Sequence, residues 1–576
     1  MVLTYPKNLL TWVWGSLLEE VRLGCHLWFM YLRTSSQKRA DGSVLTHFQI
    51  AESFWDRSAK RSKTRLLCSV GRSDDPETTD RLKRLVQSIN RRVSSEKLAP
   101  DWDIELSWSY GAIYALEALW ERLGIGEVIA EVLAERRFEF PVERALFALI
   151  ANRALAPASK LYCFEQWLAE EVVIEGVEEL ALHHLYRAMD FLVEHQHALE
   201  KAIYERVSER LQLDVELIFY DTTSLHFETD DNDEISDAQE EALRKRGHSK
   251  NGRTDAPQIV IGMAVTRDGF PVRHWVFPGN TVDVTTVAGM RADLVGWRLS
   301  RCVFVGDAGM VSEANLKALA AGGGRYILCQ PLGRDHKLAN ELLSRAGRYK
   351  PLGKDLKIKE VVIGEGERRR RYVLCLNERE RRRAERHRQQ VLTELEAELA
   401  SLSISSDSSH SKRVCALRSS RRYGRYLRQT KRGKLRISRS SVKSAARLDG
   451  KHAVFSNDDS LSSTDLALGY RQLLRVEQCW RDLKSHLGLR PVFHYAPRRI
   501  RAHVAISVLS LLMQRAAERA CNDSWRRIRD DLNQIKLVQY TTPDGRFRQT
   551  STIREDAQKR LKELGIQNPP FIVSLG

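Results

Sequence analysis

Residues 213–331 alternate between apolar runs typical of β-strands and stretches with helical spacing, and this alternation constrains the possible folds more than any other feature. Three strand-like runs come first, and the turn residues Asp268 and Gly269 separate the second from the third. A helical stretch, a fourth strand, a second helix and a fifth strand follow. This order predicts an α/β fold with a mixed five-strand sheet and flanking helices.

Two aspartates occupy the strands expected to lie at the centre of that sheet. Asp221 lies within or just after the first strand, and Asp307 lies at the tip of the fourth. The two carboxylates can therefore converge. Carboxylate oxygens are the ligands that Mg²⁺ prefers, and two such ions about 4 Å apart can promote phosphoryl transfer. An isolated acid after a strand is more often a cap or a turn residue.

A third carboxylate lies on a helix predicted from about residue 463 to residue 486. Tyr470, Glu477 and Lys484 are spaced two helical turns apart, so they share one face, and Arg481 joins that face. Glu477 could bind the metals while Lys484 and Arg481 contact flanking phosphates. The structural alternative is an exposed helix with ion pairs between neighbouring turns.

The charge balance favours a polyanionic partner. The chain of 576 residues has 92 Lys and Arg against 75 Asp and Glu, a net charge of +17, which suits nucleic acid or an anionic membrane surface. From Lys412 to Arg447 there are 14 basic residues and no acid, with Tyr423, Arg425 and Tyr426 among them. This interleaving favours a nucleic-acid surface over a solvated loop.

Other features limit the cellular setting. The nine cysteines are scattered singly, with no C-x-x-C pair, which argues against a zinc ribbon and suits a reducing cytosol. The sequence has neither an apolar run long enough to span a membrane nor an amphipathic anchor, so we expect a cytoplasmic protein without a membrane partner. Lys250, in a polar loop before the second strand, is a further candidate for DNA contact.

Together these segments resemble the DDE transposases of bacterial insertion sequences. The resemblance is greatest to the branch whose third acid lies in a Y-x2-R-x3-E-x6-K signature, which Tyr470, Glu477 and Lys484 match while Leu473 occupies the Arg position. FYDTTSLHFE around Asp221 and FVGDAGM around Asp307 resemble the family's two Asp segments. The stretches GHSKNGRTDAPQIVIG, VFPGNTVD and LRPVFHYAPRRIRAH add to the resemblance, which runs from about residue 30 to the C-terminus.

The resemblance implies an RNase H-like core interrupted by a β-rich insertion. It also implies two Mg²⁺ ions, with Mn²⁺ as a substitute, held by Asp221, Asp307 and Glu477. Water would cleave DNA at the element ends, and the freed 3′-OH would attack target DNA. The implied partners are terminal inverted repeats, target DNA and further copies of the chain on the DNA ends. We expect DNA contacts from six residues: Lys484, Arg481, Tyr470, Lys250, Tyr423 and Arg425.

Seven segments are predicted along the chain. Residues 1–29 have no counterpart in the family and are interpreted as a non-native extension. The others are a small basic strand-rich region at 30–104, a helical and DNA-binding region at 105–212, the first part of the core at 213–331, a basic insertion at 332–458, the Glu helix and a covering helix at 459–522, and a C-terminal tail at 523–576.

Three alternatives remain open at this point. The chain could be a transposase-derived DNA-binding protein that has lost catalysis, since the signature Arg is missing. It could be an RNase H-type nuclease without a joining step, although the basic insertion favours long DNA contacts. It could also be a basic membrane-surface protein, and the salt dependence of binding would separate DNA binding from apolar association.

Overall fold

The computed structural model divides the chain into two compact units: residues 1–103 with 542–544, and residues 104–541 with 545–576. The predicted extension at residues 1–29 lies almost wholly outside the described residues, and Lys250 lies outside them too. The structure describes residues 29–38, 44–56, 61–72, 74–75, 77–78, 80–82, 103–134, 136–229, 241–249, 252–253, 255–297, 299, 301–330, 332–333, 336–366, 369–402, 407–431, 433–542 and 545–575.

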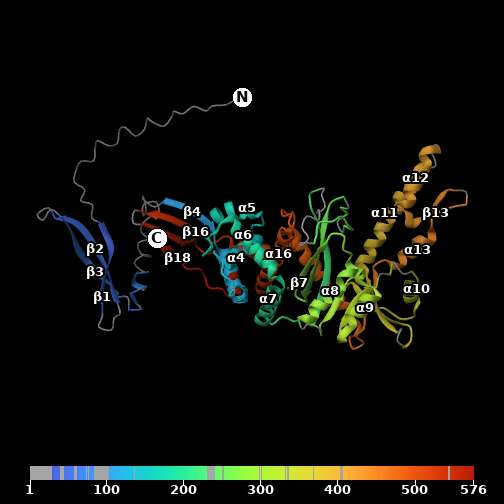
Figure 1. Cartoon of the computed structure of the whole chain (residues 1–576), viewed down its shortest axis with the longest axis horizontal. Coiled ribbons are helices and arrows are strands. Elements are labelled where there is room, and N and C mark those ends of the chain that lie inside the picture. The colour runs from blue at the N-terminus through green and yellow to red at the C-terminus, as the bar shows by residue number, and fades with distance from the viewer. Residues whose placement is uncertain are drawn as a thin grey trace, which may run out of the picture. The chain divides into compact units, whose positions relative to one another are not determined.

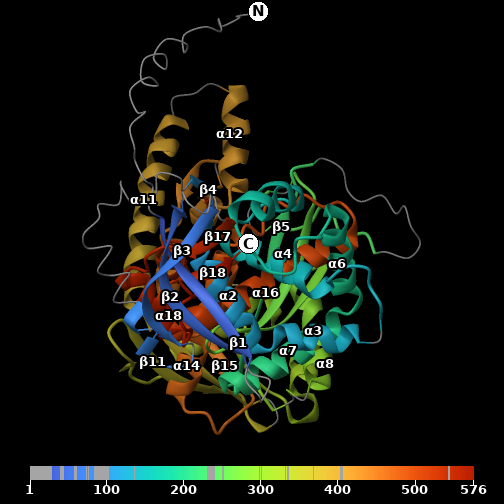
Figure 2. The same ribbon diagram turned by 90° about the vertical axis from the view of Figure 1, so that its left-hand side faces the viewer.

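The described part of the first unit is a three-stranded antiparallel sheet (Figure 2). Its strands are β1 (Phe29–Lys38), β2 (Val44–Asp56) and β3 (Arg61–Arg72), joined in the order of the sequence. Ala51 on the central strand is fully buried, whereas Leu32 and Leu66 on the outer strands are about half exposed.

The second unit contains a nine-stranded mixed sheet (Figure 1). Five of its strands lie in the order β7-β6-β5-β8-β9, with β5 parallel to β8 and antiparallel to β6. They are β5 (Leu217–His226), β6 (Gln258–Thr266), β7 (Pro271–Pro278), β8 (Val303–Gly306) and β9 (Arg325–Gln330).

The expectation of five strands is wrong, because four strands from the predicted insertion extend the same sheet. β15 pairs antiparallel with β9 and buries Ala453, Val454 and Phe455, so the edge of β9 is not left unpaired. The added strands, from β9 outwards, are β15 (Lys451–Ser456), β12 (Arg370–Asn377), β11 (Leu356–Ile363) and β10 (Lys350–Pro351).

Helices cover both faces of the sheet. On one face, α8 (Asp283–Gly296) and α9 (Glu313–Ala320) pack with Tyr220 and Phe304. On the other, α14 (Ser463–Arg471), α15 (Leu474–Ser485) and α16 (Pro497–Cys521) pack with Phe219 and Val305. The two faces follow from the alternation of side chains along β5 and β8.

Helix α16 joins the sheet to the N-terminal helical region (Figure 1). Val504 and Leu511 pack toward the sheet, whereas Ile506 and Met513 belong to the core of the helical region. The predicted covering helix is thus buried on both sides, and the helical region shares its core with it. The helices of this region are α2 (Gly111–Leu123), α3 (Ile125–Leu133), α4 (Val142–Leu155), α5 (Lys160–Tyr162), α6 (Leu182–Glu194) and α7 (Gln196–Leu211), with the π-helical turn η2 (Cys163–Glu171).

The rest of the predicted insertion is largely helical rather than β-rich. α10 (His336–Ser344) precedes β10, and a separate group of elements follows β12. That group consists of α11 (Glu378–Leu402), α12 (Asp407–Ser419), the hairpin of β13 (Leu427–Gln429) and β14 (Leu435–Ile437), and α13 (Arg439–Leu448). We call it the helical subdomain; Val391, Leu395, Leu417, Tyr426 and Leu435 are members of its own small core.

The C-terminal segment adds a four-stranded sheet and two helices. β4 (Asp103–Ser109) lies beside β16 (Lys536–Thr542), followed by β17 (Gly545–Thr550) and β18 (Ile572–Leu575). α17 (Trp525–Leu532) and α18 (Glu555–Glu563) pack into the core of the N-terminal helical region. Among the described helices, none is long and apolar enough to cross a membrane.

Candidate active site

The register of two parallel strands aligns β5 with β8 up to two residues before Asp221 and Asp307. The pairs run from Leu217 opposite Val303 to Phe219 opposite Val305. Two residues further along each strand are Asp221 and Asp307, on the face that already carries Phe219 and Val305. Asp221 is half-buried within β5, and Asp307 is exposed just after β8. Both carboxylates therefore lie on the sheet face that α15 covers.

The predicted Glu helix is two helices, which corrects the sequence expectation. α14 ends at Arg471 and α15 begins at Leu474, with Leu473 buried at the junction in the core beneath both helices. An apolar side chain at the signature's Arg position is thus explained locally by packing. The start of α14 is as expected, because Ser462 and Asp465 form a capping box.

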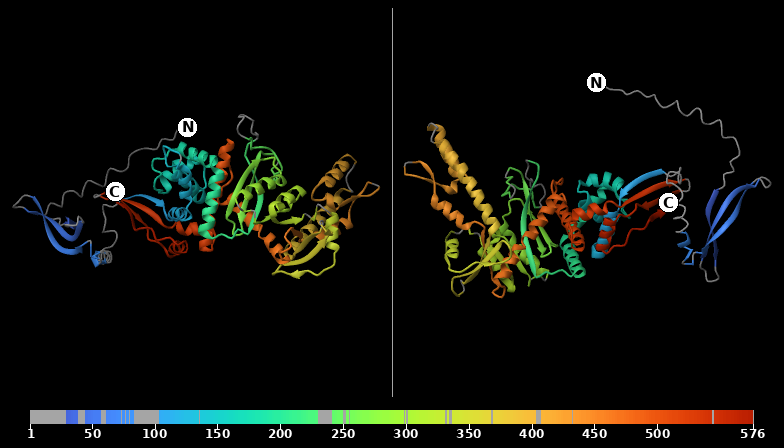
Figure 3. Two further views of the ribbon diagram at one scale, coloured as in Figure 1. Left: turned by 60° about the horizontal axis from the view of Figure 1, so that its bottom comes forward. Right: turned by 180° about the vertical axis from the view of Figure 1, so that it is seen from behind.

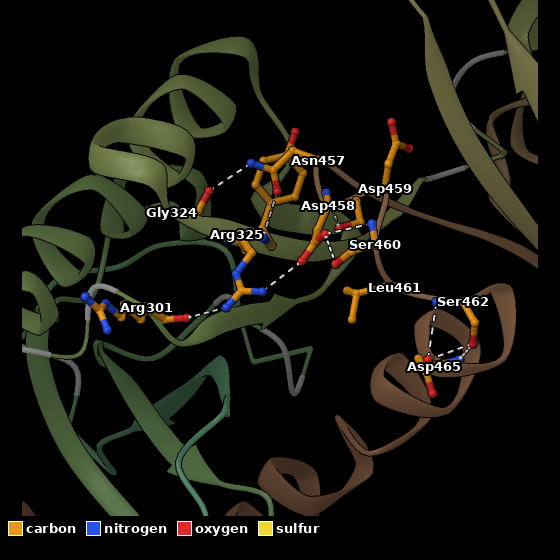
Figure 4. A network of polar contacts seen from close by, with 12 residues as sticks. Arg301, Gly324, Arg325, Asn457, Asp458, Asp459, Ser460, Leu461, Ser462 and Asp465 are labelled. Atoms are coloured by element: carbon orange, nitrogen blue, oxygen red, sulfur yellow. Dashed lines mark hydrogen bonds and ion pairs between the residues drawn. The ribbon is translucent and has the colours of Figure 1, made fainter.

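The turn between β15 and α14 is held by polar contacts with the start of β9 (Figure 4). The Arg325 guanidinium donates to Asp458 Oδ2 at 3.0 Å and to the Arg301 carbonyl at 3.2 Å. Asn457 Nδ2 donates to the Gly324 carbonyl at 2.8 Å. These bonds anchor the entry to α14, and so the position of the Glu helix, to the central sheet.

Tyr470 links α14 to the second aspartate. Its hydroxyl donates to Asp307 Oδ1 at 3.2 Å, and its ring centroid lies 5.4 Å from that of His452 on β15. Burial, followed by the nearby Cys329 thiol and the Asp307 carboxylate, raises the pKa of Tyr470, so the hydroxyl keeps its proton and remains a donor. Although the helix is broken, Tyr470 still reaches the site.

Glu477 lies in the first turn of α15, where the charge of Asp307 acts on its carboxylate. Partial burial and then repulsion by Asp307 raise the pKa of Glu477, whereas Arg481 opposes both effects. Asp307 and Glu477 therefore lie close enough to interact electrostatically. Arg481, one turn further along α15, supplies the positive charge at this position.

Lys484 ties α15 to the first aspartate's strand. Its Nζ donates to Thr223 Oγ1 at 2.6 Å. Thr223 is two residues after Asp221 and shares its face of β5. The sequence reasoning missed Thr223, although the two-residue strand period was the signal that could have identified it.

A cavity of about 260 Å³ adjoins Tyr470 and Glu477. It lies between the α14–α15 junction and the strands β11, β12 and β15 that the insertion contributes. Burial lowers the pKa of His452 in its wall. The lining residues are Asp355, Leu356, Asn377, His452, Ala467, Tyr470, Arg471, Leu473, Leu474 and Glu477.

The three carboxylates suit a hard divalent cation by chemistry, because all offer oxygen ligands and Asp307 repels Glu477. A cation between them would relieve that repulsion. Within the described parts of the chain, however, no three or more His, Cys, Asp or Glu side chains are grouped so that they could hold a metal together. Joint coordination would therefore require the side chains to move closer.

The other predicted DNA-contacting residues lie in the helical subdomain. The Tyr423 hydroxyl donates to Glu394 Oε2 at 3.1 Å, and the side chain is only half exposed. The exposed Arg425 guanidinium lies 4.6 Å from the ring centroid of the buried Tyr426. Neither Tyr423 nor Arg425 has a contact with the three carboxylates among those that the structure describes.

Comparisons with known proteins show the family of the chain. A family model described as "Transposase DDE domain" matches residues 216–513, and one described as "IS1634 family transposase, N-terminal domain" matches residues 32–101. No curated protein matches the chain. A cryo-EM structure of the piggyBac transposase synaptic complex with hairpin DNA aligns over 79% of each chain at 10% identity. Its TM-score is 0.31, too low to carry an argument.

Because the DDE match spans more than half of the chain and includes all three carboxylates, the protein belongs to the DDE transposases of insertion sequences.

Proposed function

We propose that Asp221, Asp307 and Glu477 are the catalytic carboxylates of DNA cleavage and strand transfer, on an RNase H-like core. The observation that supports the proposal is the β5–β8 register, which ends with Phe219 opposite Val305, two residues before Asp221 and Asp307, on the sheet face beneath α15. The order β7-β6-β5-β8-β9, with one acid on β5 and the other directly after the adjacent parallel strand β8, supports the assignment of the core.

DDE transposases are metal-dependent enzymes that cleave DNA by phosphoryl transfer. In our proposal the three carboxylates hold two Mg²⁺ ions, or Mn²⁺ in their place. Bound there, the ions would neutralise charge on the reacting phosphate and lower the pKa of water. The positive charge of the ions would also offset the electrostatic repulsion between the three carboxylates.

The chain's own residues position the reaction. Tyr470 orients Asp307 through its hydroxyl, and the bond from Lys484 to Thr223 holds α15 against β5. Arg481 and Lys484 lie on the same stretch of α15 as Glu477, where they can contact phosphates on either side of the scissile bond. Holding the reacting groups in a fixed orientation accounts for much of the rate enhancement of an enzyme.

The proposed substrates are the terminal inverted repeats of the element and a target duplex. Water attacks a phosphodiester at each end, which leaves a 3′-OH on the element and a 5′-phosphate on the flanking strand. That 3′-OH then attacks a target phosphodiester, which joins the element to the target and releases a 3′-OH of the target strand. Copies of the chain assemble on the two ends so that both are cut together, in the cytoplasm at the nucleoid. The family match supports the transposase chemistry, whereas the substrate ends and the assembly are part of the proposal.

Cleavage of a DNA fragment carrying the gene and its natural flanks tests the proposal. Wild-type protein with Mg²⁺ should produce breaks at defined ends, and Asp221→Asn, Asp307→Asn and Glu477→Gln should each abolish them. Asp268→Asn, at the exposed β6–β7 turn, is the matched control and should cleave normally. Tight binding to the ends without cleavage by any of these proteins would favour the inactive DNA-binding alternative.

A further inference from the structure

The β13–β14 hairpin carries like charges at directly opposite positions. Arg428 on β13 faces Arg436 on β14 in the middle pair of the ladder, and both side chains are exposed. Lys431 and Lys434, in the loop between the strands, are exposed too. Like charges opposite each other on neighbouring strands destabilise a hairpin. The repulsion between these arginines therefore destabilises the hairpin when the protein has no ligand bound.

The helix after the hairpin repeats the pattern. Arg439, Lys443 and Arg447 are spaced four residues apart along α13, and all three are exposed. Residues at this spacing form one stripe on a helix, where like charges repel. Because α13 directly follows β14, the stripe continues the basic surface of the hairpin.

Carboxylates pair with basic residues elsewhere in the helical subdomain. Glu394 pairs with Arg422 at 2.5 Å and Glu398 with Arg413 at 3.1 Å, both from α11. Arg388 of α11 pairs with Asp449 after α13. By contrast, within the described part of the chain Arg428, Arg436, Arg439 and Lys443 have no ion pair with a carboxylate.

The hairpin is firmly supported despite its charge. Leu435 and Tyr426 are buried in the small core formed with Val391 and Leu395 of α11. Figures 1 and 3 show β13 extending outward beside α11 and α13, away from the strands of the large sheet. The major groove of duplex DNA is wide enough to admit a two-stranded β-ribbon.

We propose that the β13–β14 hairpin and the exposed stripe of α13 form a second DNA-binding surface, separate from the carboxylate site, which holds the phosphate backbone of duplex DNA regardless of its sequence. This inference rests on the proposed function. Unpaired arginines and lysines at a supported, projecting ribbon are suited to phosphates, which position a protein on DNA without specifying the bases. A polyanion would also remove the repulsion between Arg428 and Arg436.

The test is the salt dependence of DNA binding by the full chain, measured without divalent metal so that no cleavage occurs. Two duplexes of equal length serve as probes, one with an element end and one of unrelated sequence. Each phosphate contact contributes about 0.9 to the slope of log affinity against log salt. The double variant R428Q/R436Q should therefore lower the slope by about 1.8, which is about 60-fold in affinity near 0.1 M salt, on both probes.

The matched control is R526Q/K559Q, which removes the same net charge from exposed positions on α17 and α18. Those cations are already paired, Arg526 with Asp530 at 4.0 Å and Lys559 with Glu563 at 3.8 Å. An unchanged slope for R428Q/R436Q, or a loss confined to the end-bearing probe, would overturn the inference. The proposed function fails separately, if wild-type protein binds both duplexes but Mg²⁺ produces no cleavage.

Discussion

Replacing Tyr470 by Phe should slow DNA cleavage about fivefold. The change removes only the hydroxyl that donates to Asp307 Oδ1 at 3.2 Å. A hydrogen bond to a charged group contributes roughly 1.5–3 kcal/mol. This bond is longer than the usual O–H···O distance and its acceptor is exposed, so about 1 kcal/mol is the appropriate value. Lost from the transition state, about 1 kcal/mol corresponds to about a fivefold slower rate.

The measurement is single-turnover cleavage of a labelled element end at a series of Mg²⁺ concentrations. Because Asp307 loses an orienting contact, Y470F should also need more Mg²⁺ for half of its maximal rate. The ring remains beside His452, so thermal stability should barely change. Tyr162→Phe is the matched control, since its hydroxyl donates to Glu171 Oε1 at 2.6 Å in the N-terminal helical region. A wild-type rate and Mg²⁺ dependence for Y470F would refute the orienting role, as would an equal loss in Y162F.

Three further predictions concern charge, packing and metal. The charge of Arg481 lowers the pKa of Glu477, so the R481Q variant should raise that pKa further. Because cleavage needs the ionised carboxylate, the acid limb of the pH–rate profile should move to higher pH. An acid limb at the wild-type pH would contradict this prediction. Leu511→Ala, at a fully buried position on α16, should cost about 2–5 kcal/mol in a denaturation midpoint experiment, whereas Leu161→Ala, at a position 46% exposed, should cost far less. Chelation of divalent ions should abolish cleavage while DNA binding persists, and cleavage that survives chelation would disprove metal dependence.

Local periodicity in the sequence was sufficient to predict much of the core. The five predicted strands occur in the predicted order, with Asp221 on β5 and Asp307 directly after β8. The capping residues at Ser462 likewise mark the start of α14 near the predicted position. These features depend on side-chain spacing and on hydrogen bonds within a few residues, which a sequence displays directly.

The contacts between distant segments were decided only by the tertiary structure. β15 joins β9 although more than a hundred residues separate them, because the pairing satisfies an edge that the local sequence does not show. The Glu helix is divided between α14 and α15 with Leu473 buried at the junction, whereas the spacing of Tyr470 and Glu477 alone predicted one continuous helix. The sequence by itself therefore determined which residues could form the site. Only the tertiary structure determined which of them meet, since burial and strand pairing depend on the whole folded chain.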